Sequence, residues 1–109
     1  MSLPPIGDVL KLMGQMGKLR EGLDQAQERA ARRRVEGAAG GGLVKATADG
    51  LGEILSVTIE AEALKDPESL GPLITAAVNL ALRKSREALI EESSAALGGL
   101  EVPPGRKEA

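Results

Sequence analysis

The sequence lacks the side chains on which most catalytic and cofactor sites are built. Its 109 residues contain no histidine, no cysteine and no aromatic residue. Without cysteine, disulfides and thiolate metal sites are excluded, and without histidine the commonest general base and imidazole ligand are missing. Carboxylates remain, but they fall mostly on predicted helix surfaces and strand ends, and the chain has no Ser-x-x-Lys spacing. We therefore expect no enzyme, no catalytic residue, no cofactor, no metal and no small-molecule substrate.

The absence of aromatic residues also limits the core and the kind of nucleic acid that could be bound. Leu, Ile, Val, Met and Ala must fill the interior, without the aromatic burials of about 150–250 Å² each. A chain of 109 residues fits one domain, residues 1–109, and a partner surface would help so small a core, so we expect a homodimer. Without stacking platforms, recognition of single strands is disfavoured, and any nucleic-acid binding should involve duplex backbone.

The chain shows no excess of positive charge. Its 14 basic and 16 acidic residues give a formal net charge of −2, so binding to nucleic acid would depend on local patches. The first residues lack the basic and apolar regions of a signal peptide, and no apolar run approaches the roughly 18 residues of a membrane-spanning helix. These observations predict a cytoplasmic protein with no membrane partner.

A long helix is predicted over residues 7–34. Apolar residues recur there at alternating steps of three and four, the pattern of a packed helix seam; they are Val9, Leu12, Met16, Leu19, Leu23, Ala26 and Ala30. Gly14, Gly17 and Gly22 each cost the helix about 1 kcal/mol relative to Ala, so its first turns need a partner or fray. From Val9 to Arg34 the helix would span about 40 Å, too long for a compact monomer to cover.

The segment 35–60 is glycine-rich and is typical of antiparallel strands. Alternating patterns predict strands over Leu43–Ala48 and Glu53–Glu60, joined by the turn Asp49–Gly52, and Val35–Ala38 could add a third strand at the edge. Gly37–Gly42 resembles a phosphate-binding loop only in composition, because a strand follows it and no Gly-Lys-Ser/Thr occurs. We interpret this stretch as a turn.

A second long helix is predicted over residues 66–97. Asp66 is the expected N-cap, Pro67 suits the first helical position, and Gly98-Gly99 would end the helix. A broad apolar stripe should pack on the sheet and on the first helix; it comprises Leu70, Leu73, Ile74, Ala77, Val78, Ala81, Leu82, Ser85, Ala88 and Leu89. Leu80 and Ile90 lie off this stripe and are candidates for a dimer surface. Residues 98–109, with two adjacent prolines, should form an extended tail.

The predicted fold is therefore α+β, with a long helix, a small antiparallel sheet of two to three strands and a second long helix (α-β-β-(β)-α). Several basic residues can pair within the helices, as Lys18–Glu21, Arg20–Asp24, Glu28–Arg32 and Arg83–Glu87. The basic residues left over on the two predicted helices are the candidate DNA contacts: Lys11, Arg29, Arg33, Arg34, Lys84 and Arg86.

Two interpretations of these residues stay open. Arg29 and Arg33 lie four apart, and like charges at this spacing destabilise a helix unless an anion or acidic partner offsets them. The run Arg32-Arg33-Arg34 at the end of a helix could contact phosphate, or it could simply complement the negative end of the helix dipole.

The order of these features resembles the YbaB/EbfC family of bacterial nucleoid-associated proteins. The resemblance covers about residues 7–105 and is carried by Val35-Glu36-Gly37-x-x-Gly40-Gly41-Gly42-Leu43-Val44-Lys45, Gly50-x-Gly52-Glu53, Asn79 followed by Arg83-Lys84, and Pro103-Pro104-Gly105. Two departures are Leu80, where the family often has Asp, and the compact run Arg32–Arg34.

The resemblance implies a tweezer-like homodimer whose sheets associate centrally and whose long helices project. It implies binding of double-stranded DNA with low sequence specificity, in the nucleoid, with effects on nucleoid organisation and gene expression. Basic positions on the two long helices would contribute to binding. The alternative is a protein–protein adaptor without direct DNA binding, for which the net charge and the off-stripe residues Leu80 and Ile90 argue.

Overall fold

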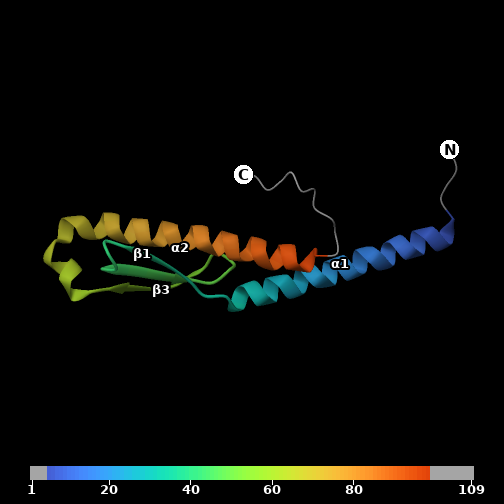
Figure 1. The fold of residues 1–109 in the computed structure, drawn as a ribbon, viewed down its shortest axis with the longest axis horizontal. Helices are drawn as coiled ribbons and strands as arrows, with labels where there is room; N and C mark the ends of the chain where they lie inside the picture. The colour runs from blue at the N-terminus through green and yellow to red at the C-terminus, as the bar shows by residue number, and fades with distance from the viewer. Residues whose placement is uncertain (1–4, 99–109) are drawn as a thin grey trace.

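A small sheet lies against one half of a long helix, and a second long helix packs on the other half, in the computed structural model, which describes residues 5–98 (Figure 1). The elements in chain order are α1 (Ile6–Arg32), β1 (Val35–Ala39), β2 (Val44–Ala48), β3 (Ile54–Ile59), the short 3-10 helix η1 (Ala61–Lys65) and α2 (Pro67–Ala96). The predicted α-β-β-β-α order is confirmed, and the optional edge strand is present.

The three strands form an antiparallel sheet in the order β1-β2-β3. Gly37 of β1 and Val57 of β3 both pair with Ala46 of β2, so these three residues share one face. Gly40, Gly41 and Gly42 link β1 to β2 with φ values of 65°, 69° and 97°, a conformation that residues other than Gly rarely adopt. The prediction of a turn is thus correct for Gly40–Gly42 but wrong for Gly37, which lies within β1.

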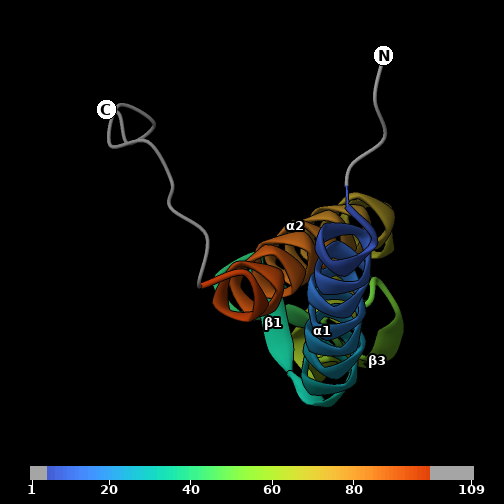
Figure 2. The ribbon, with the colours of Figure 1, turned by 90° about the vertical axis from the view of Figure 1, so that its right-hand side faces the viewer.

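Helix α2 holds the molecule together because it packs on the sheet with one half and on α1 with the other (Figures 1 and 2). The buried apolar residues between these elements are almost all alanine: Ala26, Ala30, Val44, Ala46, Ala48, Ala63, Ala77, Ala81 and Ala88. The predicted stripe of α2 is confirmed, since its buried residues Ala77, Ala81, Ser85 and Ala88 all belong to that stripe. Small side chains at these positions allow close approach of the backbones.

Gly37 is the point of closest approach between β1 and α2. A Cβ atom built at Gly37 would lie 2.4 Å from the Ala77 carbonyl oxygen and 2.5 Å from the Ala81 nitrogen. Neither backbone atom can move without displacing the helix. The absence of a side chain at Gly37 therefore sets the spacing between α2 and the sheet, and Leu80 lies half-buried beside it rather than on a free surface.

The turn between β2 and β3 is tied to both helices. Asp49 closes it by accepting hydrogen bonds from the backbone N–H groups of Leu51 (2.8 Å) and Glu53 (3.0 Å). Ser85 of α2, fully buried, accepts from the Gly52 N–H at 2.8 Å, and the Gly50 N–H donates to the Ala30 carbonyl of α1 at 2.8 Å. These polar groups of the turn are thus satisfied.

This contact with Gly50 explains why α1 ends earlier than predicted. A continued helix would use the Ala30 carbonyl to accept from the Arg34 N–H, but that oxygen accepts from Gly50 and from Arg33 instead. Arg33 is extended (φ −70°, ψ 148°), so Arg33 and Arg34 lie outside the helix. The predicted end at residue 34 is wrong by two residues, and only Arg29 and Arg32 remain in the last turn.

Smaller differences occur at other element ends. Asp66 lies at the predicted N-cap of α2, but its side chain makes no cap; its Oδ2 accepts from the Ser69 hydroxyl at 2.6 Å. Helix α2 ends at Ala96, one residue before the predicted end, and the sequence pattern gives no sign of η1. The predicted extended tail, apart from Gly98, lies outside the described residues. None of the described helices is long and apolar enough to cross a membrane.

The described part of the chain is elongated, measuring 73 × 30 × 23 Å. Its radius of gyration is 20.9 Å, whereas about 13 Å is typical of a compact domain of this size. Figure 1 shows the reason: α1 extends far beyond the end of α2. Of its seven predicted seam residues only Ala26 and Ala30 are buried, and the seam residues from Val9 to Leu23 are 37 to 61% exposed.

We expect Gly37→Ala to lower the free energy of unfolding by about 3 kcal/mol, because the added methyl group meets the backbone of α2. Urea denaturation followed by circular dichroism measures this. The matched control is Gly14→Ala, where a Cβ meets nothing within 4 Å and the helix should gain about 1 kcal/mol. Equal stability of the Gly37→Ala variant and the wild type would contradict the close-approach account.

Candidate nucleic-acid interface

Four of the six predicted DNA contacts gather where α1 passes into β1. Arg29 lies in the last turn of α1, and Arg33 and Arg34 form the link to β1. Lys84 reaches the same place from α2, since its Nζ donates to the Glu36 carbonyl of β1 at 2.8 Å. We call Arg29, Arg33, Arg34 and Lys84 the junction cluster.

Two members of the junction cluster are engaged by carboxylates of α2. The Arg29 Nε donates to Glu92 Oε1 at 2.9 Å, and the Arg33 Nη1 donates to Glu92 Oε2 at 2.9 Å. The second terminal nitrogen of Arg33, Nη2, donates to Glu91 Oε1 at 2.9 Å. The acidic partner that the like-charged Arg29 and Arg33 require is therefore Glu92, which receives one hydrogen bond on each carboxylate oxygen.

These contacts shift two protonation equilibria. The hydrogen bonds that Arg29 and then Arg33 donate hold the pKa of the Glu92 carboxyl below its ordinary value. The Glu91 and Glu92 hydrogen bonds raise the pKa of Arg33 above its ordinary value. Glu92 is the better shielded carboxylate, with a side chain 18% exposed against 65% for Glu91. The pair Arg29–Glu92 thus joins the ends of the two helices as well as shaping the local charge.

The other two members of the cluster contact backbone oxygens. The Arg34 Nη1 donates to the carbonyls of Ala31 (3.0 Å) and Arg33 (2.8 Å), so its side chain folds back over the end of α1. Such contacts satisfy terminal carbonyls of a helix, which supports the dipole interpretation for Arg34. Arg34 and Lys84 are both exposed, and their remaining donors face no carboxylate among the contacts within the described residues.

The structure does not bring Lys11 to the junction cluster. It lies exposed on the projecting part of α1, about 27 Å along the helix from Arg29 at 1.5 Å per residue. Arg86 is exposed on α2, two positions after Lys84 and therefore on a different side of that helix.

Sequence reasoning missed the role of Glu91 and Glu92. Within residues 5–98, ion pairs join Arg29 and Arg33 to these two carboxylates and Lys65 to Glu62, so the four predicted intrahelical pairs are not formed. Arg29 of α1 and Arg33 of the link that follows therefore pair with α2 rather than with residues of their own segment. Arg32 and Arg83, for which helix spacing predicted intrahelical partners, are exposed and belong with the candidate basic residues.

Comparison of the sequence with known proteins identifies the family of this chain. Residues 6–100 match the YbaB/EbfC DNA-binding family. The chain belongs to this family. A nucleoid-associated protein of Pelotomaculum thermopropionicum is 40% identical over 99 residues, covering 89% of this chain and 94% of that protein. A nucleoid-associated protein of Desulforamulus reducens is 42% identical over 99 residues, with the same coverage of both chains.

A solved structure shares the fold. It is the crystal structure of an uncharacterized protein of Helicobacter pylori, with a TM-score of 0.70 and 24% identity. The match covers 80% of this chain and 94% of that one. The architecture described above therefore also forms from a chain of quite different sequence.

We expect Glu92→Gln to lower the midpoint of thermal unfolding at pH 7, with a smaller effect for the more exposed Glu91→Gln. Because the folded pKa of Glu92 is lowered, its stabilising contribution is complete above the ordinary Glu pKa of about 4.3 and is lost as the pH falls through the folded pKa. The difference in melting temperature between wild type and Glu92→Gln should shrink as the pH falls from about 7 to about 3. A difference that stays constant over this range would contradict the assignment.

Proposed function

We propose that this protein is a nucleoid-associated protein that binds double-stranded DNA as a homodimer, through the phosphate backbone and with low sequence specificity. Membership of a DNA-binding family and relatives called nucleoid-associated proteins support this proposal. In this role it acts in the cytoplasm, on the nucleoid, where it affects nucleoid organisation and gene expression, and it performs no catalysis.

The observation that carries the proposal is the junction cluster. A chain of net charge −2 binds a polyanion only where cations gather, and Arg29, Arg33, Arg34 and Lys84 gather at one end of the sheet. Glu92 fixes the two arginines without occupying all their donors, since Arg29 uses only its Nε in that contact. The terminal nitrogens of Arg29, with Arg34 and Lys84, are then the groups that contact phosphates.

The side chains available favour backbone contacts over base reading. The chain has no aromatic residue to stack on bases. Base readout in the major groove usually places several side chains of one projecting helix or strand pair against the base edges. Lys84 and the arginines instead lie beside β1 and at the helix ends, on different elements. Phosphate contacts position a protein on DNA but carry no sequence information, which accounts for low specificity.

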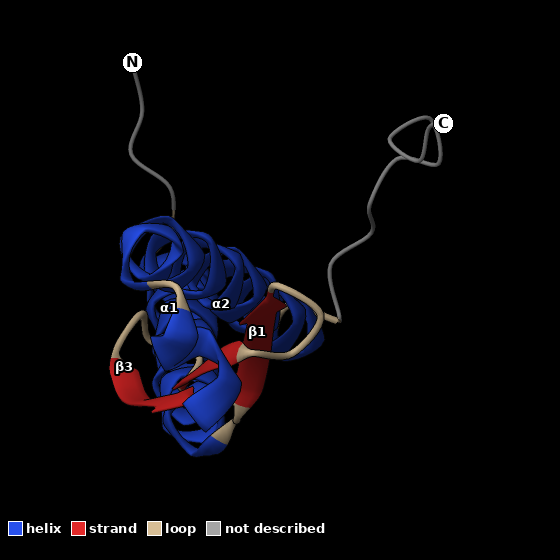
Figure 3. Ribbon diagram, turned by 90° about the vertical axis from the view of Figure 1, so that its left-hand side faces the viewer, coloured by secondary structure: helices blue, strands red, loops and turns tan. Residues whose placement is uncertain are grey.

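The dimer is proposed to form at the edge strand β3. Val57 and Ile59 lie on the face of the sheet that α2 covers over β1 and β2, yet they remain 40% and 36% exposed. Figure 3 shows β3 at the outer edge of the sheet, away from α2. An edge strand with apolar side chains invites pairing with another chain, and a second copy would cover both its backbone and these residues.

A titration with a duplex labelled for fluorescence anisotropy tests DNA binding. The logarithm of the association constant should fall linearly with the logarithm of salt concentration, with a slope of about −0.9 per phosphate neutralised. Arg34→Ala and Lys84→Ala should each make the slope shallower by about 0.9 for every phosphate that is no longer neutralised, on two unrelated duplexes alike. The control is Lys65→Ala, which removes the same charge from η1 at the far end of the sheet. Weaker binding to one duplex only would indicate base readout and contradict backbone binding.

Sedimentation velocity tests the dimer interface. Val57→Lys should convert the protein to monomers, because it places a charge in the proposed contact between two β3 strands. Thr58→Lys is the matched control, since Thr58 is the next residue of the same strand, pairs with Lys45 and points to the opposite face. A dimer that survives Val57→Lys with native circular dichroism would contradict this interface.

A further inference from the structure

The seam of α1 continues past the end of the helix that covers it. Ala26 and Ala30 are fully buried, but α2 ends at Ala96, opposite Gly22. Residues 6–21 of α1 then run on for about 24 Å at 1.5 Å per residue. Over this length Leu12 and Met16 are 56% and 61% exposed.

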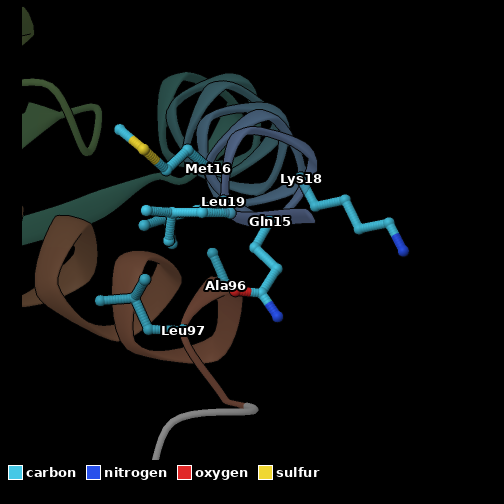
Figure 4. A pocket seen from close by; sticks show the side chains of 7 residues that line it. Gln15, Met16, Lys18, Leu19, Ala96 and Leu97 are labelled. Carbon is cyan, nitrogen blue, oxygen red and sulfur yellow. The ribbon is translucent and has the colours of Figure 1, made fainter. Parts of the chain in front are cut away.

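An apolar groove opens at this point (Figure 4). It has a volume of about 550 Å³ and is lined by Leu12, Gln15, Met16, Lys18, Leu19, Ala96 and Leu97. Figure 4 shows Leu19 lying between α1 and the end of α2, whereas Lys18 extends away from Ala96 and Leu97. The groove thus has an apolar floor made by both helices, and it begins where the described part of α2 stops.

The chain that follows α2 starts at this groove and carries the side chains that suit it. Leu97 is part of the lining, and the next apolar residues along the sequence are Leu100, Val102, Pro103 and Pro104. The two prolines cannot extend α2, and they have no backbone N–H to leave unsatisfied on an apolar surface. In an extended chain Leu100 and Val102 face the same side.

Length and direction also fit. Helix α2 runs antiparallel to α1, so its last described turn points toward the N-terminal part of α1 (Figure 1). Residues 99–104 span about 19 Å at the 3.1 Å per residue typical of proline-rich chain. That length reaches from the level of Leu19 to the level of Val9. We propose that residues 100–104 of the same chain occupy the groove and cover the seam of α1 from Leu19 to Leu12.

Attachment favours this occupant over a second copy. A segment that begins at the edge of its own groove has an effective concentration in the millimolar range, far above that of a separate chain. The projecting part of α1 needs such support, because Gly7, Gly14 and Gly17 weaken it by about 1 kcal/mol each. The docked segment supplies apolar contacts in place of a third helix, and this proposal does not depend on DNA binding.

Disulfide trapping in the full chain tests the proposal, because the protein has no cysteine of its own. The pair Leu12→Cys with Val102→Cys should oxidise to an intramolecular disulfide on the order of tenfold faster than the control pair Gly14→Cys with Val102→Cys. Gly14 lies two positions from Leu12 on the opposite side of α1, where a Cβ meets nothing within 4 Å. Non-reducing electrophoresis and mass spectrometry of digests identify the product.

Equal rates for the two pairs would overturn the proposal, as would a product that is predominantly an intermolecular dimer, which would assign the groove to a second copy. Hydrogen exchange gives an independent readout that needs no cysteine. Leu100→Ser with Val102→Ser should raise amide exchange of residues 9–19 about tenfold and leave the sheet unchanged, while Glu101→Ser with Lys107→Ser should alter neither. Unchanged exchange in the first double variant would overturn the proposal as well.

Discussion

The contact between the backbones of β1 and α2 at Gly37 is the constraint on which the rest of the structure depends. Because Gly37 has no side chain, α2 lies directly on the strand, and the fully buried residues of the interface are mostly alanines, with larger apolar side chains only partly buried around them. This explains how a chain without aromatic residues builds a core. The same helix then extends beyond the sheet to meet α1, so the spacing set at Gly37 also determines where Glu91 and Glu92 meet Arg29 and Arg33.

The charges at the junction serve stability and the proposed function together. Glu92 joins α2 to the end of α1 and to the link that follows, and its lowered pKa reports the same hydrogen bonds. The charges of Arg29 and Arg33 are therefore partly neutralised by Glu91 and Glu92. Arg34 and Lys84, which contact only backbone oxygens among the described residues, keep more of their charge for an external anion.

Much of the fold follows from the sequence, because each element carries a local signal. The seam from Val9 to Ala30 and the alternation in β2 and β3 are periodic, and Asp66-Pro67 and Gly40–Gly42 mark ends and turns. The end of α1 does not follow, because it depends on Gly50, a residue of the distant hairpin that takes the Ala30 carbonyl. The sequence alone does not place Gly37 in a strand either, because the need for glycine there depends on the position of α2.

The candidate site was predictable only as a set of residue types. Removing apparent intrahelical pairs leaves six basic residues on the two predicted helices, four of which the fold brings together at the junction. The pairing of Arg29 and Arg33 with α2 could not be foreseen, because it depends on how the two helices align. Helix spacing alone favours partners on the same helix, and the structure instead pairs these arginines across the interface.

The central claim, that the protein binds the backbone of duplex DNA, is tested most directly by competition between nucleic acids. The wild-type protein is bound to a labelled duplex at low salt and challenged with unlabelled duplexes of two unrelated sequences and with their separated strands. The account predicts that both duplexes compete equally well and that each duplex competes better than its single strands. Failure to bind any duplex, or stronger competition by single strands, would contradict it.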